Sequence, residues 1–151
     1  MTTPSPLERL IGTWDFEATS EGSFLGRGSA TFSWMEDGAF VVERADDEPD
    51  PRTDPGWAEH SPMPVTAVLG FDDTTDECAM LYADARGVFR IYRVTITDEA
   101  WTVWRAAPRF FQRFVGTFRD DGRVIDGQWD SSEDGSAWQP DFQLTYRRRA
   151  G

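Results

Sequence analysis

Short runs in which apolar and polar residues alternate make up most of the chain. Examples are Trp14-Phe16-Ala18, Ala30-Phe32-Trp34, Phe114-Gly116-Phe118, Ile125-Gly127-Trp129 and Phe142-Leu144-Tyr146. Alternation with a period of two is typical of β-strands, because successive side chains of a strand point to opposite faces of the sheet. Turn signals separate the runs, among them Asp37-Gly38, Asp121-Gly122 and Asp134-Gly135. The pattern predicts about ten strands joined mostly by short hairpin turns.

A sheet of about ten short antiparallel strands must close or fold over to hide its edges. The chain lacks the alternation of strands and helices that a parallel sheet requires. We therefore expect an all-β fold, a closed antiparallel up-and-down β-barrel, in one domain of residues 1–151. A short helix over residues 5–11 should cap it, because Ser5-Pro6-Leu7-Glu8 has the pattern of a capping box and Gly12 ends the apolar face.

One segment has no period of its own. Residues 46–64 contain five Pro and many acidic residues. Long loops without secondary structure are uncommon inside a compact domain, and those that occur are often lids or disordered segments. We interpret residues 46–64 as a lid or rim loop of the barrel, and a disordered segment is the alternative.

Charge and composition exclude several classes of function. The 15 basic residues are all Arg, and against 27 acidic residues they give a formal net charge of -12. This charge argues against nucleic acid or anionic membranes as partners. Without Lys the chain cannot form an internal Schiff base, and one His with one Cys cannot build a His-rich or Cys-rich metal site. Residues 1–6 lack the features of a signal peptide, so we expect a cytoplasmic protein.

Hairpin pairing predicts which side chains face the interior, because residues paired across an antiparallel ladder share a face. A turn at Asp37-Gly38 pairs Phe32 with Glu43, so an interior Phe32 and Trp34 bring Glu43 with them. In the same way, a turn at Asp121-Gly122 pairs Phe118 with Ile125 and Phe114 with Trp129, which places Gln112 inside. A turn at Asp134-Gly135 then pairs Ile125 with Leu144.

The middle of the chain allows two assignments. A turn near Arg86-Gly87 groups Ala79, Leu81 and Ala83 with Arg90, Tyr92 and Val94, and a turn at Asp98-Glu99 adds Arg105 to that face. We place this face inward. In the alternative the opposite face points inward, and it holds Met80, Tyr82, Phe89, Ile91, Arg93 and Trp104.

Two inward Arg residues would need anionic partners, because burying an unpaired charge is costly. Glu43 can neutralise one of them. The other could hold the carboxylate or phosphate of a ligand, for which the planar guanidinium is well shaped. In a second interpretation Arg90, Arg105 and Glu43 form a closed ion-pair network, and Asp84 could also reach Arg86 or Arg90 and weaken the case for a ligand.

Two residues are candidates for proton transfer. His60 is the one side chain with an ordinary pKa near neutrality, and it lies in the 46–64 segment between Trp57 and Met63. It could close over the barrel mouth, or simply be solvated. Glu43 could serve as an acid or base if burial raises its pKa.

Gly12-Thr13-Trp14, directly after the expected helix, resembles the Gly-x-Trp that opens the first strand of calycins, the superfamily of lipocalin-like barrels. Calycins also stack an Arg of the last strand on that Trp, a role that Arg147 or Arg148 could take. A closer resemblance is to an uncharacterised bacterial family of lipocalin-like barrels, over residues 38–44, 81–88, 112–114 and 141–146. This resemblance implies the fold and brings no activity with it.

Two further resemblances concern ligands. Nitrobindins are related barrels that bind haem through a His near the C-terminus, but residues 138–147 contain no His and His60 would have to swing inward. We therefore expect no haem and no other cofactor, and keep a nitrobindin-like haem protein as the third hypothesis. Arg90-Ile91-Tyr92 is similar to the Arg-x-Tyr with which fatty-acid-binding proteins hold a carboxylate, although theirs lies near the chain end.

The first functional hypothesis is an intracellular binding protein for an apolar or amphipathic molecule, which can also carry an anionic group. Its binding residues would be Trp34, Glu43, Arg90, Tyr92, Arg105, Gln112 and His60. The alternative is a cofactor-independent isomerase or cyclase in which Glu43 or His60 moves protons. An interaction module with a solid aromatic interior is a further alternative, and exposed aromatics such as Trp104 could support a homodimer.

Overall fold

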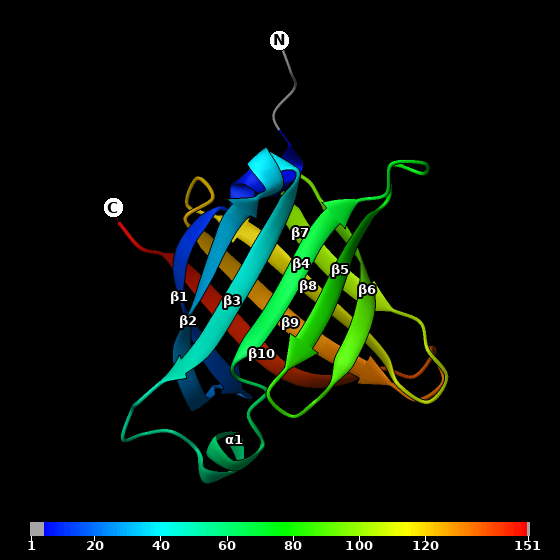
Figure 1. Ribbon diagram of the computed structural model, residues 1–151. Helices are drawn as coiled ribbons and strands as arrows, with labels where there is room; N and C mark the ends of the chain where they lie inside the picture. Colours follow the sequence, from blue (N-terminus) through cyan, green and yellow to red (C-terminus); the bar gives the residue numbers. More distant parts are fainter. Residues whose placement is uncertain (1–4, 151) are drawn as a thin grey trace.

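Ten antiparallel strands form one closed barrel in the computed structural model, which describes residues 5–150 (Figure 1). Each strand pairs with its neighbours in sequence, and the first strand closes the ring against the last. The strands are β1 (Gly12–Ser20), β2 (Ser23–Met35), β3 (Phe40–Glu48), β4 (Val65–Phe71), β5 (Cys78–Asp84), β6 (Phe89–Ile96), β7 (Ala100–Arg105), β8 (Phe111–Arg119), β9 (Val124–Ser132) and β10 (Gln139–Arg148). The predicted all-β, up-and-down barrel is confirmed.

The short helix expected over residues 5–11 is a 3-10 helix, η1 (Pro6–Leu10), which lies across one end of the barrel (Figure 1). The Ser5 side chain caps it by accepting a hydrogen bond of 3.2 Å from the Leu7 N–H. Leu7 and Leu10 are buried, and the indole N–H of Trp14 donates to the Leu10 carbonyl at 2.9 Å. This end of the barrel is therefore closed.

Aromatic side chains fill the interior beneath η1. The Trp101 ring packs edge-on against Phe32 and Phe114, with centroid distances of 5.8 and 5.1 Å. Glycine makes room for such rings, since a Cβ on Gly127 would lie 2.3 Å from the Phe114 ring. The buried aromatic layer forms the core of the molecule and separates the closed end from the rest of the barrel.

Arg148 joins the two ends of the chain across the closing strand pair. It pairs with Trp14 in the β1–β10 register, and its guanidinium carbon lies 4.2 Å from the Trp14 ring centroid. The same guanidinium donates to the carbonyl oxygens of Ile11 and Arg9. Arg148, and not Arg147, thus takes the stacking position expected from the calycin resemblance.

The β2–β3, β8–β9 and β9–β10 hairpins turn the predicted side chains toward the interior. Phe32 pairs with Glu43 between β2 and β3, and Phe118 pairs with Ile125 between β8 and β9. Between β9 and β10 the predicted register is wrong by two residues, because Ile125 pairs with Tyr146 and a bulge lies between Pro140 and Phe142. A shift of two residues preserves the face, so the inward set of β10 is as predicted.

The face predicted for β5 is wrong. Tyr82 pairs with Arg90 and Met80 with Tyr92, so Met80 and Tyr82 face inward, while Leu81 is exposed. The cause is the loop after β5, in which the Asp84 N–H donates to the Val88 carbonyl at 3.0 Å and three residues remain between them. We had assumed a two-residue turn. A loop one residue longer shifts the pairing by one, so the side chains of β5 predicted to face inward face outward, and the reverse.

The segment interpreted as a lid or rim loop is shorter than residues 46–64, since residues 46–48 extend β3. The remaining residues, 49–64, include a helix, α1 (Pro55–His60), that lies below the open end of the barrel (Figure 1). Asp54 caps α1, and Asp47 of β3 holds it by accepting hydrogen bonds of 3.1 Å from the Trp57 indole and 2.5 Å from the Ser61 hydroxyl. No helix within residues 5–150 is both long and apolar enough to cross a membrane.

Candidate functional site

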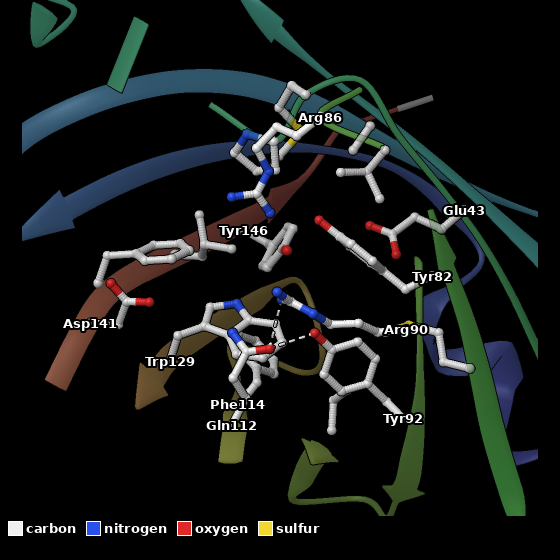
Figure 2. Close-up of a pocket in the computed structure, with 18 of the residues that line it drawn as sticks. Glu43, Tyr82, Arg86, Arg90, Tyr92, Gln112, Phe114, Trp129, Asp141 and Tyr146 are labelled. Atoms are coloured by element: carbon white, nitrogen blue, oxygen red, sulfur yellow. Dashed lines mark hydrogen bonds between the residues drawn. The ribbon is translucent and has the colours of Figure 1, made fainter. Parts of the chain in front are cut away.

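The half of the barrel nearer α1 is hollow. It contains a cavity of about 310 Å³, a size within the range of small-molecule sites (Figure 2). Apolar and aromatic side chains line most of it, among them Met63, Met80, Phe114, Trp129, Phe142 and Leu144. The interaction-module alternative required an interior filled solid by aromatic residues. The cavity shows that the interior is not filled in this way.

Three polar side chains meet on one wall of the cavity. The Gln112 side-chain oxygen, on β8, accepts hydrogen bonds from the Tyr92 hydroxyl at 2.6 Å and from an Arg90 guanidinium nitrogen at 3.2 Å (Figure 2). Tyr92 and Arg90 come from β6, where they share the inward face. With its oxygen so engaged, the Gln112 amide presents its NH₂ group as a donor, beside the remaining N–H groups of Arg90. The predicted grouping of these three residues is what the structure shows.

The Arg90 guanidinium has no carboxylate partner among residues 5–150. It contacts the Gln112 oxygen, and its carbon lies 4.7 Å from the centroid of the Phe110 ring. The ion-pair network that we considered for Arg90, Arg105 and Glu43 does not form. Arg90, as part of the cavity wall, therefore presents to the cavity a positive charge that no carboxylate of these residues neutralises.

Asp84 pairs with Arg86 and not with Arg90. Its carboxylate accepts from Arg86 at 2.7 and 3.1 Å and from the Tyr82 hydroxyl at 2.8 Å. Arg86 and Asp141 both line the mouth of the cavity (Figure 2). Partial burial raises the pKa of the Asp141 carboxyl, and the charge of Arg86 acts in the opposite direction. The mouth thus carries both signs of charge, with Arg86 already paired to Asp84, whereas Arg90 on the wall has no carboxylate partner among residues 5–150.

Glu43 faces the cavity from β3, as predicted. In the ring of ten strands β3 stands opposite β8, which carries Gln112. The Glu43 side chain is buried, with 8 % of the residue exposed, and no group within residues 5–150 donates a hydrogen bond to it. Burial in these apolar surroundings raises the pKa of Glu43 from 4.5 to about 7.

Two predicted binding residues lie outside the cavity. Arg105 ends β7, beyond the last β6–β7 pair at Trp104, and lines an outer groove with that residue. Trp34 lies one residue before the end of β2 and packs against the core, without lining the cavity. Hairpin pairing predicted the face of each residue, but it carries no information on height along the barrel, and the cavity occupies only part of that height.

His60 lies at the mouth of the cavity, at the last residue of α1. Its side chain is 77 % exposed, and its Nε2 is 3.7 Å from the Glu59 carboxylate. The chain has no other His, so His60 is the one imidazole that could ligate a haem at this cavity. The described residues do not gather three His, Cys, Asp or Glu side chains as a metal site would require.

Several lining residues were missed in the sequence. Tyr82 was placed on the wrong face by the turn assignment, although the alternative assignment included it. Tyr146 and Trp129 were predicted to be inward but were given no role, and nothing in the local sequence distinguishes them from core aromatics. Arg86 lies in the β5–β6 loop and Asp141 at the bulge of β10, and a period-two pattern gives no direction at either place.

Comparison with known proteins supports the fold. No protein-family model matches the chain, and no curated protein matches its sequence. The chain is similar to the crystal structure of Rv2717c from M. tuberculosis, with a TM-score of 0.60 and 11% sequence identity. The match covers 99% of this chain and 100% of that one. A likeness at this identity extends to the barrel architecture, so function has to be argued from the cavity itself.

Proposed function

We propose that the protein binds a small amphipathic acid, with the apolar part of the ligand in the barrel cavity and its acid group on Arg90. The observation that carries the proposal is the Arg90 guanidinium, which lines the cavity without a carboxylate partner among the described residues. Arg90 is half-buried, so its charge has lost part of its hydration, which an anion would replace, and a carboxylate can accept two of its N–H groups at once.

The neighbours of Arg90 support an anion at this place. Tyr92 and Gln112 are buried, and their mutual hydrogen bond fixes the amide so that its NH₂ group is free to donate. Phe110 lies over one face of the guanidinium, in a cation–π contact that leaves the N–H groups at its edge free to donate. A carboxylate beside Arg90 would thus find donors from two residues held in place before it binds, which reduces the ordering cost of binding.

Binding of matched ligands tests the proposal. Calorimetric titration would compare octanoate with octanol, which has the same chain and no charge. Arg90→Ala should weaken octanoate binding at least tenfold, about 1.4 kcal/mol, because the ion-to-ion contact is lost. Octanol binding should change less than twofold.

Two other Arg variants serve as controls. Arg93→Ala removes the same charge from the outward face of β6, where Arg93 pairs with Glu77, and should leave octanoate binding unchanged. Arg119→Ala removes a guanidinium that pairs with Asp126 on the outer surface and should also leave octanoate binding unchanged. Equal weakening by Arg90→Ala and by either control would show a general charge effect and would reject Arg90 as the anchor.

A second candidate function rests on Glu43, whose pKa of about 7 suits a general base that works near neutral pH. In this proposal the protein moves protons on a bound keto acid, as an isomerase would. NMR would follow deuterium uptake next to the carbonyl group of levulinic acid in D₂O. The protein should accelerate it, Glu43→Gln should abolish the acceleration, and His60→Ala should retain it. No acceleration over buffer in the wild type would remove this candidate.

A further inference from the structure

The cavity contains polar groups that the proposed anchor at Arg90 does not use. They belong to Glu43 of β3, Trp101 of β7 and Tyr146 of β10, which are 8 %, 3 % and 7 % exposed. All three line the cavity. They come from three different strands, so it is the closed barrel, and not one hairpin, that brings them to the same cavity.

None of the three groups has a hydrogen-bond partner among residues 5–150. The Trp101 indole nitrogen is fully buried and unpaired. Burial is the cause of the raised pKa of Glu43, with no protein donor to oppose it. For Tyr146, burial and the charge of Glu43 raise the pKa of the hydroxyl. Buried polar groups are nearly always paired, and a molecule in the cavity is the available partner for Glu43 and Tyr146, which line it.

Glu43 is separate from the cluster at Arg90. Figure 2 shows Glu43 apart from the hydrogen-bonded Arg90, Gln112 and Tyr92, with the Tyr82 ring between them in that view. The Tyr82 hydroxyl is already committed to Asp84 at 2.8 Å, so it does not serve Glu43. The charge of Glu43 acts on Tyr146, which places these two groups in one electrostatic environment.

We propose that the Glu43 carboxyl and the Tyr146 hydroxyl form a second polar subsite, which binds a hydroxyl group of the ligand, so that the ligand is a hydroxy acid. The inference rests on the proposed function, because it takes the acid group to be held at Arg90. Trp101 borders this subsite with its ring, whose centroid lies 6.2 Å from that of Tyr146, while its indole nitrogen is fully buried.

The chemistry of the two groups selects a hydroxyl. A second carboxylate would be repelled by an ionised Glu43, and an ammonium group, which only donates, could not accept a hydrogen bond from the Tyr146 phenol. Glu43 is in part protonated at neutral pH, since burial raises its pKa to about 7. A hydroxyl both donates and accepts, and can therefore pair with either form of the carboxyl and with the phenol of Tyr146.

Paired ligands test the subsite. The titration would use hexanoic, octanoic and decanoic acid, each with its ω-hydroxy counterpart, because the length that spans the two subsites is found by experiment. For at least one length the hydroxy acid should bind at least tenfold more tightly than the plain acid. Tyr146→Phe and Glu43→Met should each reduce this preference at least fivefold, since each removes a partner of the hydroxyl. Glu43→Gln, which keeps hydrogen-bonding groups, should retain most of it.

Two controls separate this inference from the proposed function. Arg90→Ala should weaken both acids of a pair equally and leave the preference for the hydroxy acid unchanged. Glu17→Gln removes one carboxylate from an exposed position on β1 and should change nothing.

The unfavourable outcomes are also distinct. If no acid binds, or binding does not depend on Arg90, the proposed function fails and this inference fails with it. If acids bind through Arg90 but no length shows a preference for the hydroxyl group, water alone occupies the subsite and the inference is wrong. A preference that survives both Tyr146→Phe and Glu43→Met would overturn it as well.

Discussion

Glu43 is a carboxyl group in apolar surroundings, and its position follows directly from one hairpin register. Phe32 is buried in the core, and the β2–β3 ladder puts Glu43 on the same face. The Glu43 proton should therefore be bound more tightly in the folded protein than in the unfolded chain. Its pKa is about 7 when folded and 4.5 in the ordinary environment of an unfolded chain.

This difference predicts how stability depends on pH. Because the folded state holds the proton more tightly, the contribution of Glu43 is present in full below pH 4.5 and is lost as the pH rises to about 7. Between pH 5 and 8 the wild type should lose roughly 2 kcal/mol of unfolding free energy that Glu43→Gln does not lose. Urea unfolding at a series of pH values measures it. Parallel curves for the two proteins would show that Glu43 is not buried as described.

Elements differ in how far the sequence predicts them. The hairpins at Asp37-Gly38 and Asp121-Gly122 were predicted with the correct register, because the flanking strands alternate cleanly. The β5–β6 hairpin was not, because its strands are apolar on both faces and its loop has an odd number of residues. Asp84 fixes that loop by accepting the Arg86 N–H at 2.8 Å, a local bond that the sequence alone did not reveal.

The segment after β3 was also predicted only in part. Its composition predicted a departure from the sheet, and residues 49–64 do leave it. The sequence did not predict that β3 continues through Glu48, nor that α1 forms. A six-residue helix is too short to be stable alone, so α1 depends on the Asp54 cap and on the Trp57 contact with the Phe142 ring, 5.5 Å between centroids.

For the whole molecule, the number of strands and their closure were predictable, since alternation and turn spacing leave few ways to hide sheet edges. The division of the interior into a filled end and a hollow end was not. That division decides which inward residues belong to the site. Arg90, Tyr92 and Gln112 lie at the hollow level, Trp34 does not, and Arg105 lies beside the outer groove.

The large apolar side chains exposed on β6 are different from the aromatic residue that the sequence suggested for a homodimer. Phe89 and Ile91 on β6 are 65 % and 59 % exposed, whereas Trp104 is half-buried. The homodimer expected from the sequence thus stays a prediction. The central claim concerns the interior, where an unpaired guanidinium meets an apolar cavity.

A crystal structure of the protein with octanoate tests that claim most directly. The account predicts electron density for the alkyl chain inside the barrel, with the carboxylate within hydrogen-bonding distance of the Arg90 guanidinium and the Gln112 amide nitrogen. A carboxylate bound at Arg86 in the mouth, or a cavity that holds only water under saturating octanoate, would contradict it.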